Sequence, residues 1–211
     1  MTTRSKILRF LPLACLALAA PARAEVAFEF FGGTAFNVPT TLTVVQAGYP
    51  PIEFTGHYDV RPTADRMYYA ARFEVWQGDK GWIIEELHHK LYLANPHGDV
   101  QEFEVTHGYN LVTVNRGWRR GRAVLLLGGG AVIGYPHSTI RNQTWPMDAG
   151  YYLAGVTVQG AAGRRFDLSK HIFLSLEGKL TASWAQVPVL HGHATVPNAA
   201  AHVLVGLGGR F

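Results

Sequence analysis

Hydrophobic and polar side chains alternate with a period of two along most of the chain, and this alternation predicts β-strands. Around Leu174, Ser175 and Leu176, for example, every second side chain is apolar. Runs of this kind are long enough for strands that cross a bilayer at a tilt. Eight runs of about ten residues or more show the pattern, at 26–36, 67–77, 82–93, 103–118, 122–135, 151–163, 171–184 and 200–211.

The connections between these runs alternate in length. Short connections, with the sequences QGDKG, RRGR and RRFDLSK, follow the second, fourth and sixth runs. Long connections follow the other runs, at 37–66, 94–102, 136–150 and 185–199. An even strand number with short turns at one end and long loops at the other is typical of bacterial outer-membrane barrels.

We therefore predict an all-β fold: an eight-stranded, antiparallel, up-and-down transmembrane β-barrel with short periplasmic turns and long extracellular loops. The apolar runs TLTVV and IEFTGHYDV, within 37–66, could extend the first two strands beyond the membrane. A soluble barrel that carries a small ligand stays open as an alternative, and it would need a charged exterior.

The first 24 residues differ in composition from the rest. Positive charges precede an apolar run that ends in Ala22, Arg23 and Ala24, the pattern of a secretory signal peptide. We expect residues 1–24 to be this signal and residues 25–211 to be the barrel domain. Cleavage there removes four positive charges and the only cysteine, so the formal charge of +4 falls to zero. Such a chain gives no indication of a nucleic-acid partner, a disulfide or a thiol nucleophile.

The C-terminal sequence HVLVGLGGRF, which ends on Phe211, resembles the closing strand of small eight-stranded outer-membrane barrels. In that family the assembly machinery of the outer membrane recognises the terminal aromatic residue. The resemblance implies the outer membrane of a Gram-negative bacterium as the location. It also implies outer-membrane lipids, including lipopolysaccharide, as partners.

Charged side chains occupy the face that the alternation assigns to the barrel interior. Both signs are mixed there, and eight strands enclose a space just wide enough for side chains, so we expect a packed lumen and no general pore. Glu85 falls on the outward face, which is costly unless it lies near the edge of the bilayer or a bulge turns it inward. The expected inward residues are Glu29, Arg72, Glu74, Glu86, His88, Lys90, Glu104, Glu177, Lys179 and Arg210.

The stretch 85–107 holds four of the ten histidines. Adjacent residues on a strand point to opposite faces, so His88 and His89 belong to different sites. A turn near Gly98 would place His89 opposite His107 on the outer wall. The inward group is either a salt-bridge network or an acid–base site. The candidate catalytic residues are Glu86, His88, Lys90, Glu104 and His107.

The same residue types are candidate ligands of a divalent metal ion, because imidazole and carboxylate groups both bind such ions. The candidate metal ligands are His88, His89, Glu104 and His107. Aromatic residues near the ends of the strands are expected to contact lipid. The candidates for lipid contact are Tyr69, Tyr92, Tyr109, Tyr152 and Trp184.

The sequences EELHHKLY (85–92) and EFEVTHGYNLVTVN (102–115) resemble the paired motifs of lipid A oxidase-like outer-membrane barrels. The resemblance implies oxidation of the proximal glucosamine of lipid A by oxygen, with a divalent metal ion as a candidate cofactor. The matching positions are Glu86, His88, His89, Lys90, Tyr92, Glu104, Thr106, His107, Gly108 and Asn110.

Two alternatives to an oxidase stay open. In the lipid A deacylase family the catalytic histidine and serine lie two apart on one strand, whereas His137 and Ser138 are adjacent here, so those roles are not transferred. A non-enzymatic barrel that acts through its extracellular loops, above all 37–66, is the other alternative.

Overall fold

The computed structural model describes residues 24–64, 67–145 and 150–211. The predicted signal peptide lies outside the described residues, apart from Ala24. The described residues include no helix long and apolar enough to cross a membrane. Eight long strands dominate this part of the chain: β1 (Glu25–Val38), β5 (Tyr69–Gln77), β6 (Lys80–Leu93), β7 (Val100–Arg120), β8 (Ala123–Gly134), β11 (Tyr152–Asp167), β12 (Ile172–Val189) and β14 (Asn198–Arg210).

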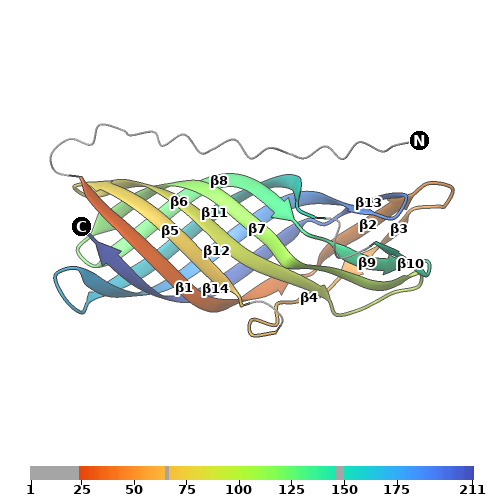
Figure 1. Ribbon diagram of the computed structural model, residues 1–211, viewed down its shortest axis with the longest axis horizontal. Helices are drawn as coiled ribbons and strands as arrows, with labels where there is room; N and C mark the ends of the chain where they lie inside the picture. The colour runs from red at the N-terminus through yellow and green to blue at the C-terminus, as the bar shows by residue number, and fades with distance from the viewer. Residues whose placement is uncertain (1–23, 65–66, 146–149) are drawn as a thin grey trace.

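Each of these strands pairs antiparallel with the long strand before it and the long strand after it. The ring of pairings closes because β1 also pairs with β14, from Ala27 opposite Arg210 to Val38 opposite Ala199. Figure 1 shows the strands crossing the long axis of the molecule at a tilt. The predicted eight-stranded, up-and-down antiparallel fold is confirmed.

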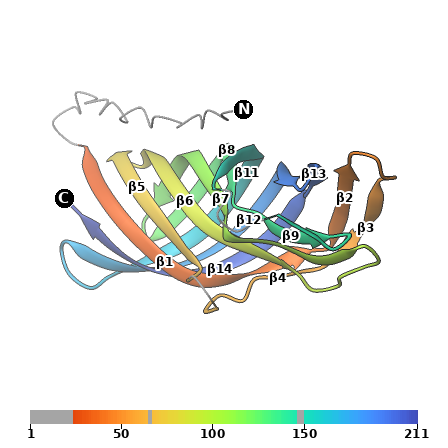
Figure 2. The same ribbon diagram turned by 45° about the vertical axis from the view of Figure 1, so that its right-hand side comes forward.

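The two ends of the barrel differ in the way predicted. At one end β5 and β6, and likewise β7 and β8, are joined by two-residue turns at 78–79 and 121–122. At the other end the strands continue into short additional strands, most of which lie toward the right of Figure 2. TLTVV lies in β2, and IEFTGHYDV spans β3 and β4, so both form strands as expected. The short strands are β2 (Thr40–Gln46), β3 (Ile52–Gly56), β4 (Tyr58–Asp59), β9 (His137–Ile140), β10 (Gln143–Trp145) and β13 (Gly192–Thr195).

The outer wall of the barrel exposes apolar side chains on every long strand. A soluble barrel would turn charged side chains outward on these strands, so this exterior favours a barrel that spans a bilayer. Exposed apolar side chains, one for each strand in chain order, are Phe28, Phe73, Ile84, Val114, Leu127, Val158, Leu180 and Val205.

The interior is filled in layers. An apolar cluster that includes Trp76 and Ile83 closes the short-turn end. A larger apolar cluster, which includes Leu87, Leu91 and Tyr109, fills the end nearer the loops. A bonded group of seven charged side chains, which we name the ion network, also fills the interior. Its members are Glu29, Arg72, Glu74, Glu85, Arg165, Glu177 and Lys179.

The ion network confirms most of the inward positions predicted outside β6 and β7. Glu29, Arg72, Glu74, Glu177 and Lys179 are all buried within it. The guanidinium of Arg210 lies over the ring of the buried Phe173 and bonds to Asp167 at the short-turn mouth. The packed lumen expected from the sequence is therefore present.

Candidate functional site

Strand β6 presents the opposite faces to those predicted. Glu85 has no exposed surface and bonds to Arg72, Lys179 and Gln159 in the interior. Because side chains alternate along a strand, Glu86, His88 and Lys90 face outward, so their predicted inward placement is wrong. The lipid-facing position assigned to Glu85 is wrong for the same reason. The inward residues of β6, all without exposed surface, are Ile83, Glu85, Leu87, His89 and Leu91.

A β-bulge in β7 changes the register opposite β6. His89 lies opposite Tyr109, but Leu91 lies opposite Val105, so three residues of β7 face one residue of β6. Gly108 occupies this bulge with φ +132°, and a Cβ there would lie 2.0 Å from the side-chain nitrogen Nδ2 of Asn110. The bulge places Asn110 opposite His88 and Tyr109 opposite His89, where His107 was expected.

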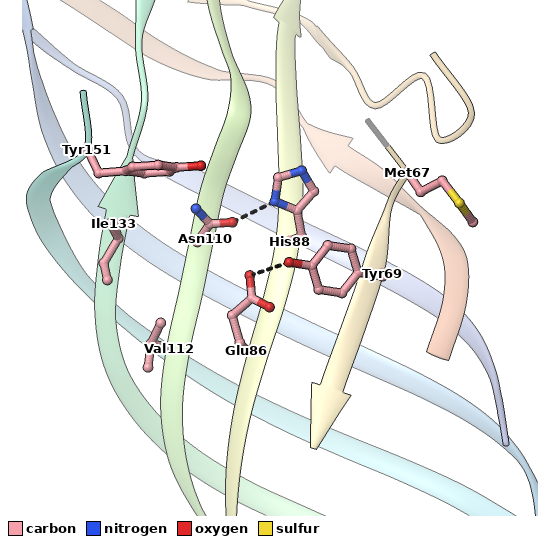
Figure 3. A pocket seen from close by; sticks show the side chains of 8 residues that line it. All are labelled: Met67, Tyr69, Glu86, His88, Asn110, Val112, Ile133 and Tyr151. Carbon is pink, nitrogen blue, oxygen red and sulfur yellow. Dashed lines mark hydrogen bonds between the residues drawn. The ribbon is translucent and has the colours of Figure 1, made fainter. Parts of the chain in front are cut away.

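The outward side chains of β5, β6 and β7 meet in a cleft of about 580 Å³ on the outer wall. We name it the wall cleft, and Figure 3 shows its lining. It contains two polar pairs, each between neighbouring strands: His88 with Asn110, and Tyr69 with Glu86. The lining residues are Met67, Tyr69, Glu86, His88, Asn110, Val112, Ile133 and Tyr151.

His88 is held on two sides. Its Nδ1 lies 2.7 Å from the Oδ1 of Asn110, and its ring stacks on Tyr69 with centroids 5.1 Å apart. The side chain of His88 is only 4% exposed because these neighbours cover it. The Tyr69 hydroxyl donates to Glu86 at 3.3 Å, so four polar side chains form one connected group (Figure 3).

The wall cleft lies within the apolar band of the barrel. Trp82, exposed beside a short turn, and His88 are six residues apart on β6, a rise of ~20 Å along the strand. At a typical tilt of ~40° this corresponds to ~15 Å along the barrel axis, whereas the apolar band of such barrels is ~25 Å tall. The polar group therefore lies in the half of the band nearer the loops.

Lys90 faces outward beyond His88 but is fully buried. Its ammonium donates to the carbonyl oxygens of Arg61 and Ala64, at 2.7 and 2.6 Å. The guanidinium of Arg61 in turn lies 4.5 Å from the ring centroid of Tyr92. Lys90 thus fixes a segment of the first long loop against the outer wall, next to the wall cleft. Glu104, opposite Tyr92, also lies on the outward face, where it accepts a hydrogen bond from Thr106, so its predicted inward placement is wrong.

The predicted pair of His89 and His107 on the outer wall is not formed. His89 is buried inside the barrel, where its Nε2 lies 3.0 Å from Asn37 Oδ1 and its ring meets His202. His107, in the bulge, stacks on Tyr135 with centroids 4.8 Å apart.

The candidate metal ligands are distributed over both faces of the wall. His88 and Glu104 face outward, whereas His89 faces inward. Among residues 24–64, 67–145 and 150–211, no three His, Cys, Asp or Glu side chains lie close enough to hold a metal ion. This part of the chain does not fit a metal ion held by protein ligands alone.

The five candidates for lipid contact are placed differently from one another. Trp184, 52% exposed, and the half-buried Tyr69 lie on the outer wall as expected. Tyr109 is in the interior, where its hydroxyl donates to the carbonyl of Val196, so that prediction is wrong. Tyr92 is covered beneath Arg61, and Tyr152 is half-buried with its ring near Trp145.

Sequence reasoning assigned no catalytic role to Asn110 and did not include Met67 or Tyr151 in the site. Asn110 follows the bulge glycine, so its direction depends on a register change that alternation alone does not show. Its position in the THGYN motif was the one available signal.

No protein-family model matches the chain, and no curated protein is similar enough to match it. Several solved structures share its strand arrangement. The attachment invasion locus protein Ail of Yersinia pestis is 15% identical, with a TM-score of 0.41 over 90% of this chain and 99% of that one. Neisserial surface protein A is 7% identical, with a TM-score of 0.45 over 89% and 97%. The outer-membrane protein AlkL is 10% identical, with a TM-score of 0.47 over 90% of each chain. This likeness concerns the fold alone.

Proposed function

We propose that this barrel lies in the outer membrane, binds lipid A of lipopolysaccharide in the wall cleft and modifies it there. One observation carries the proposal: Tyr69, Glu86, His88 and Asn110 form a connected polar group on the outer wall, within the apolar band. Ionisable groups at membrane depth are costly, and where they occur they mark functional sites by default.

The position of the cleft favours a lipid as the ligand. It opens sideways from the barrel wall, and its lining combines the polar group with the apolar side chains of Met67, Val112 and Ile133. A sugar-phosphate head group that carries acyl chains presents the same combination. The interior is packed with the ion network and the apolar clusters, so the wall is the face that a membrane lipid can reach.

The side chains in the cleft are suited to acid–base chemistry. An amide oxygen only accepts hydrogen bonds, so Asn110 Oδ1 fixes the proton of neutral His88 on Nδ1 and makes Nε2 the basic nitrogen of the ring. Glu86, two residues away on the same face, provides a carboxylate that Tyr69 orients. We assign His88 and Glu86 to proton transfer with the bound sugar, and Asn110 and Tyr69 to positioning them.

The resemblance of 85–92 and 102–115 to lipid A oxidase-like barrels gives the proposal its expected product, a lipid A that has gained one oxygen atom. Oxygen would be the oxidant: the C1 hemiacetal of the proximal glucosamine would lose two electrons and two protons to O2, giving a lactone and H2O2. Water would then open the lactone to the acid, which accounts for the one added oxygen atom. No step of the proposal passes through a metal ion, because the described residues do not fit one.

Mass spectrometry of lipid A from cells with and without this chain tests the proposal. We expect the gain of one oxygen only with the intact chain, and its loss in His88→Ala and Glu86→Gln. The matched control is His57→Ala, since His57 is exposed on the loop side, away from the wall cleft. Heat-dependent gel mobility shows that each variant is folded.

Each outcome of this experiment decides a part of the proposal. Loss of an acyl chain would replace oxidation by hydrolysis at the same cleft. If His57→Ala abolished the oxygen gain as His88→Ala does, the activity could not be assigned to the wall cleft. Identical spectra with and without the chain would contradict modification and leave a non-enzymatic role for the extracellular strands.

A further inference from the structure

A second hollow adjoins the wall cleft on the side nearer the short turns. It is an open groove of about 510 Å³ on the outer wall. Glu86 lines both the cleft and the groove, so the two hollows adjoin at this residue. We name it the aromatic groove, and its outward lining residues are Phe28, Phe30, Ala71, Phe73, Ile84, Glu86 and Leu207.

A single small residue creates this groove. On the outer face Ala71 lies between Phe30 of β1 and Glu86 of β6. Phe30 stacks on Tyr69 with centroids 5.5 Å apart, and Phe28 meets Phe73 at 4.9 Å. The ring of Phe30 therefore packs on Tyr69 and the ring of Phe28 on Phe73, and the methyl group of Ala71 forms the floor between the two pairs.

Polarity changes in one direction along the hollow. The row through Tyr69, His88 and Asn110 is polar, and the row through Phe28, Phe73 and Ile84 is apolar. Glu86 lies in the row between them. The two rows are four residues apart along β6, a distance of ~13 Å. A molecule that fills both hollows is polar at the end nearer the loops and apolar at the end nearer the short turns.

We propose that the aromatic groove holds one acyl chain of the lipid whose head group occupies the wall cleft, and that Ala71 determines the fit of that chain. This inference rests on the proposed function and deepens it, because it makes a particular acyl chain part of what the barrel recognises. The adjacency of groove and cleft at Glu86 and the order of polarity favour this occupant. A lipid that only solvates the wall would have no preferred position.

The experiment compares two identical substitutions on the lipid-facing wall. Ala71→Leu fills the floor of the groove, whereas Ala162→Leu adds the same side chain on β11, where Ala162 is exposed beside Gly178 and Leu125. Both variants are reconstituted in vesicles of phosphatidylethanolamine and phosphatidylglycerol. The vesicles contain lipid A with a photoreactive diazirine near the end of one acyl chain. Peptide mass spectrometry then locates the cross-links.

We expect cross-links to be enriched severalfold on β5 and β6 over β11 and β12. Ala71→Leu lowers this enrichment severalfold, and Ala162→Leu leaves it unchanged. Uniform labelling around the barrel, or an enrichment that survives Ala71→Leu, would overturn the inference. Ala71→Val provides a smaller filling side chain in case Ala71→Leu does not fold.

The failure of the groove and the failure of the proposed function are distinguishable. Enriched cross-linking without a mass change in cellular lipid A would support the groove and contradict modification. A mass change with uniform cross-linking would retain the modification and remove the groove. Loss of the enriched cross-links on addition of unlabelled lipid A, but not of the same amount of extra phosphatidylglycerol, confirms that the occupant is the glycolipid.

Discussion

Arg72 is the residue at which the packing of the lumen can be tested most directly. Its Nε donates to Glu85 at 2.7 Å, and its two Nη atoms donate to Glu177 at 3.0 and 2.7 Å. The ion network contains four carboxylates and three cations, a formal charge of −1. Substitution Arg72→Met raises this imbalance to −2 and removes one donor from Glu85 and both guanidinium hydrogen bonds from Glu177.

Removal of one partner from a buried ion pair costs ~3–5 kcal/mol. The matched substitution Glu29→Gln moves the network to formal neutrality and retains an amide oxygen for Arg165, whose Nη2 lies 2.9 Å from Glu29 Oε2. Its expected cost is about 1 kcal/mol or less, the size of one hydrogen bond. The two variants thus separate loss of a cation from loss of a carboxylate.

Urea titration of the barrel in vesicles, followed by heat-dependent gel mobility, measures both effects. With an m-value of ~2 kcal/mol/M, Arg72→Met lowers the midpoint by roughly 1.5–2.5 M, and Glu29→Gln lowers it by about 0.5 M or less. Equal shifts for both variants would refute the reasoning from charge balance. A negligible shift for Arg72→Met would show that the network adds little to stability.

Three further predictions concern other parts of the fold. Lys90→Met removes the donor that fixes segment 61–64, so proteinase K cleavage in this segment of the vesicle-bound barrel rises severalfold; unchanged cleavage would contradict this role. Gly130→Ala places a Cβ 2.0 Å from a backbone oxygen and lowers the free energy of unfolding by ~1–3 kcal/mol, whereas Gly160→Ala, with no neighbour nearer than 3.9 Å, is nearly neutral in the same urea titration. We propose that Phe211 is the contact for the assembly machinery, so its deletion lowers the membrane-assembled fraction severalfold, and normal assembly would rule this out.

The positions of the strands could be predicted from the sequence, because the alternation of apolar and polar residues is a property of neighbouring residues alone. It also predicted the faces of β12 correctly, where every inward side chain from Ser175 to Ser183 is polar and the outward ones are mostly apolar. Because one face of β12 is polar and the other is apolar, only one choice of inward face is consistent with an apolar outer wall. The ion network follows directly from that regularity.

The faces of β6 could not be predicted in this way, because each face carries both kinds of side chain. Its inward face includes Glu85 and His89 among leucines, since the barrel interior is charged in one part and apolar in another. Its outward face includes both Ile84 and His88, because the outer wall is apolar near the short turns and polar at the wall cleft. The charge of Glu85 on the supposed lipid face was the one sign of an inverted strand, and the bulge at Gly108 added a shift that no periodicity reveals.

The lateral opening of the wall cleft has a kinetic consequence. A ligand that enters from the bilayer arrives by diffusion in two dimensions, so occupancy follows its mole fraction in the leaflet and is independent of the number of vesicles per volume. Diluting lipid A with phosphatidylglycerol at constant total lipid would slow the proposed modification, and adding more vesicles of the same composition would not restore its rate. The proposed modification would therefore depend on the local composition of one leaflet.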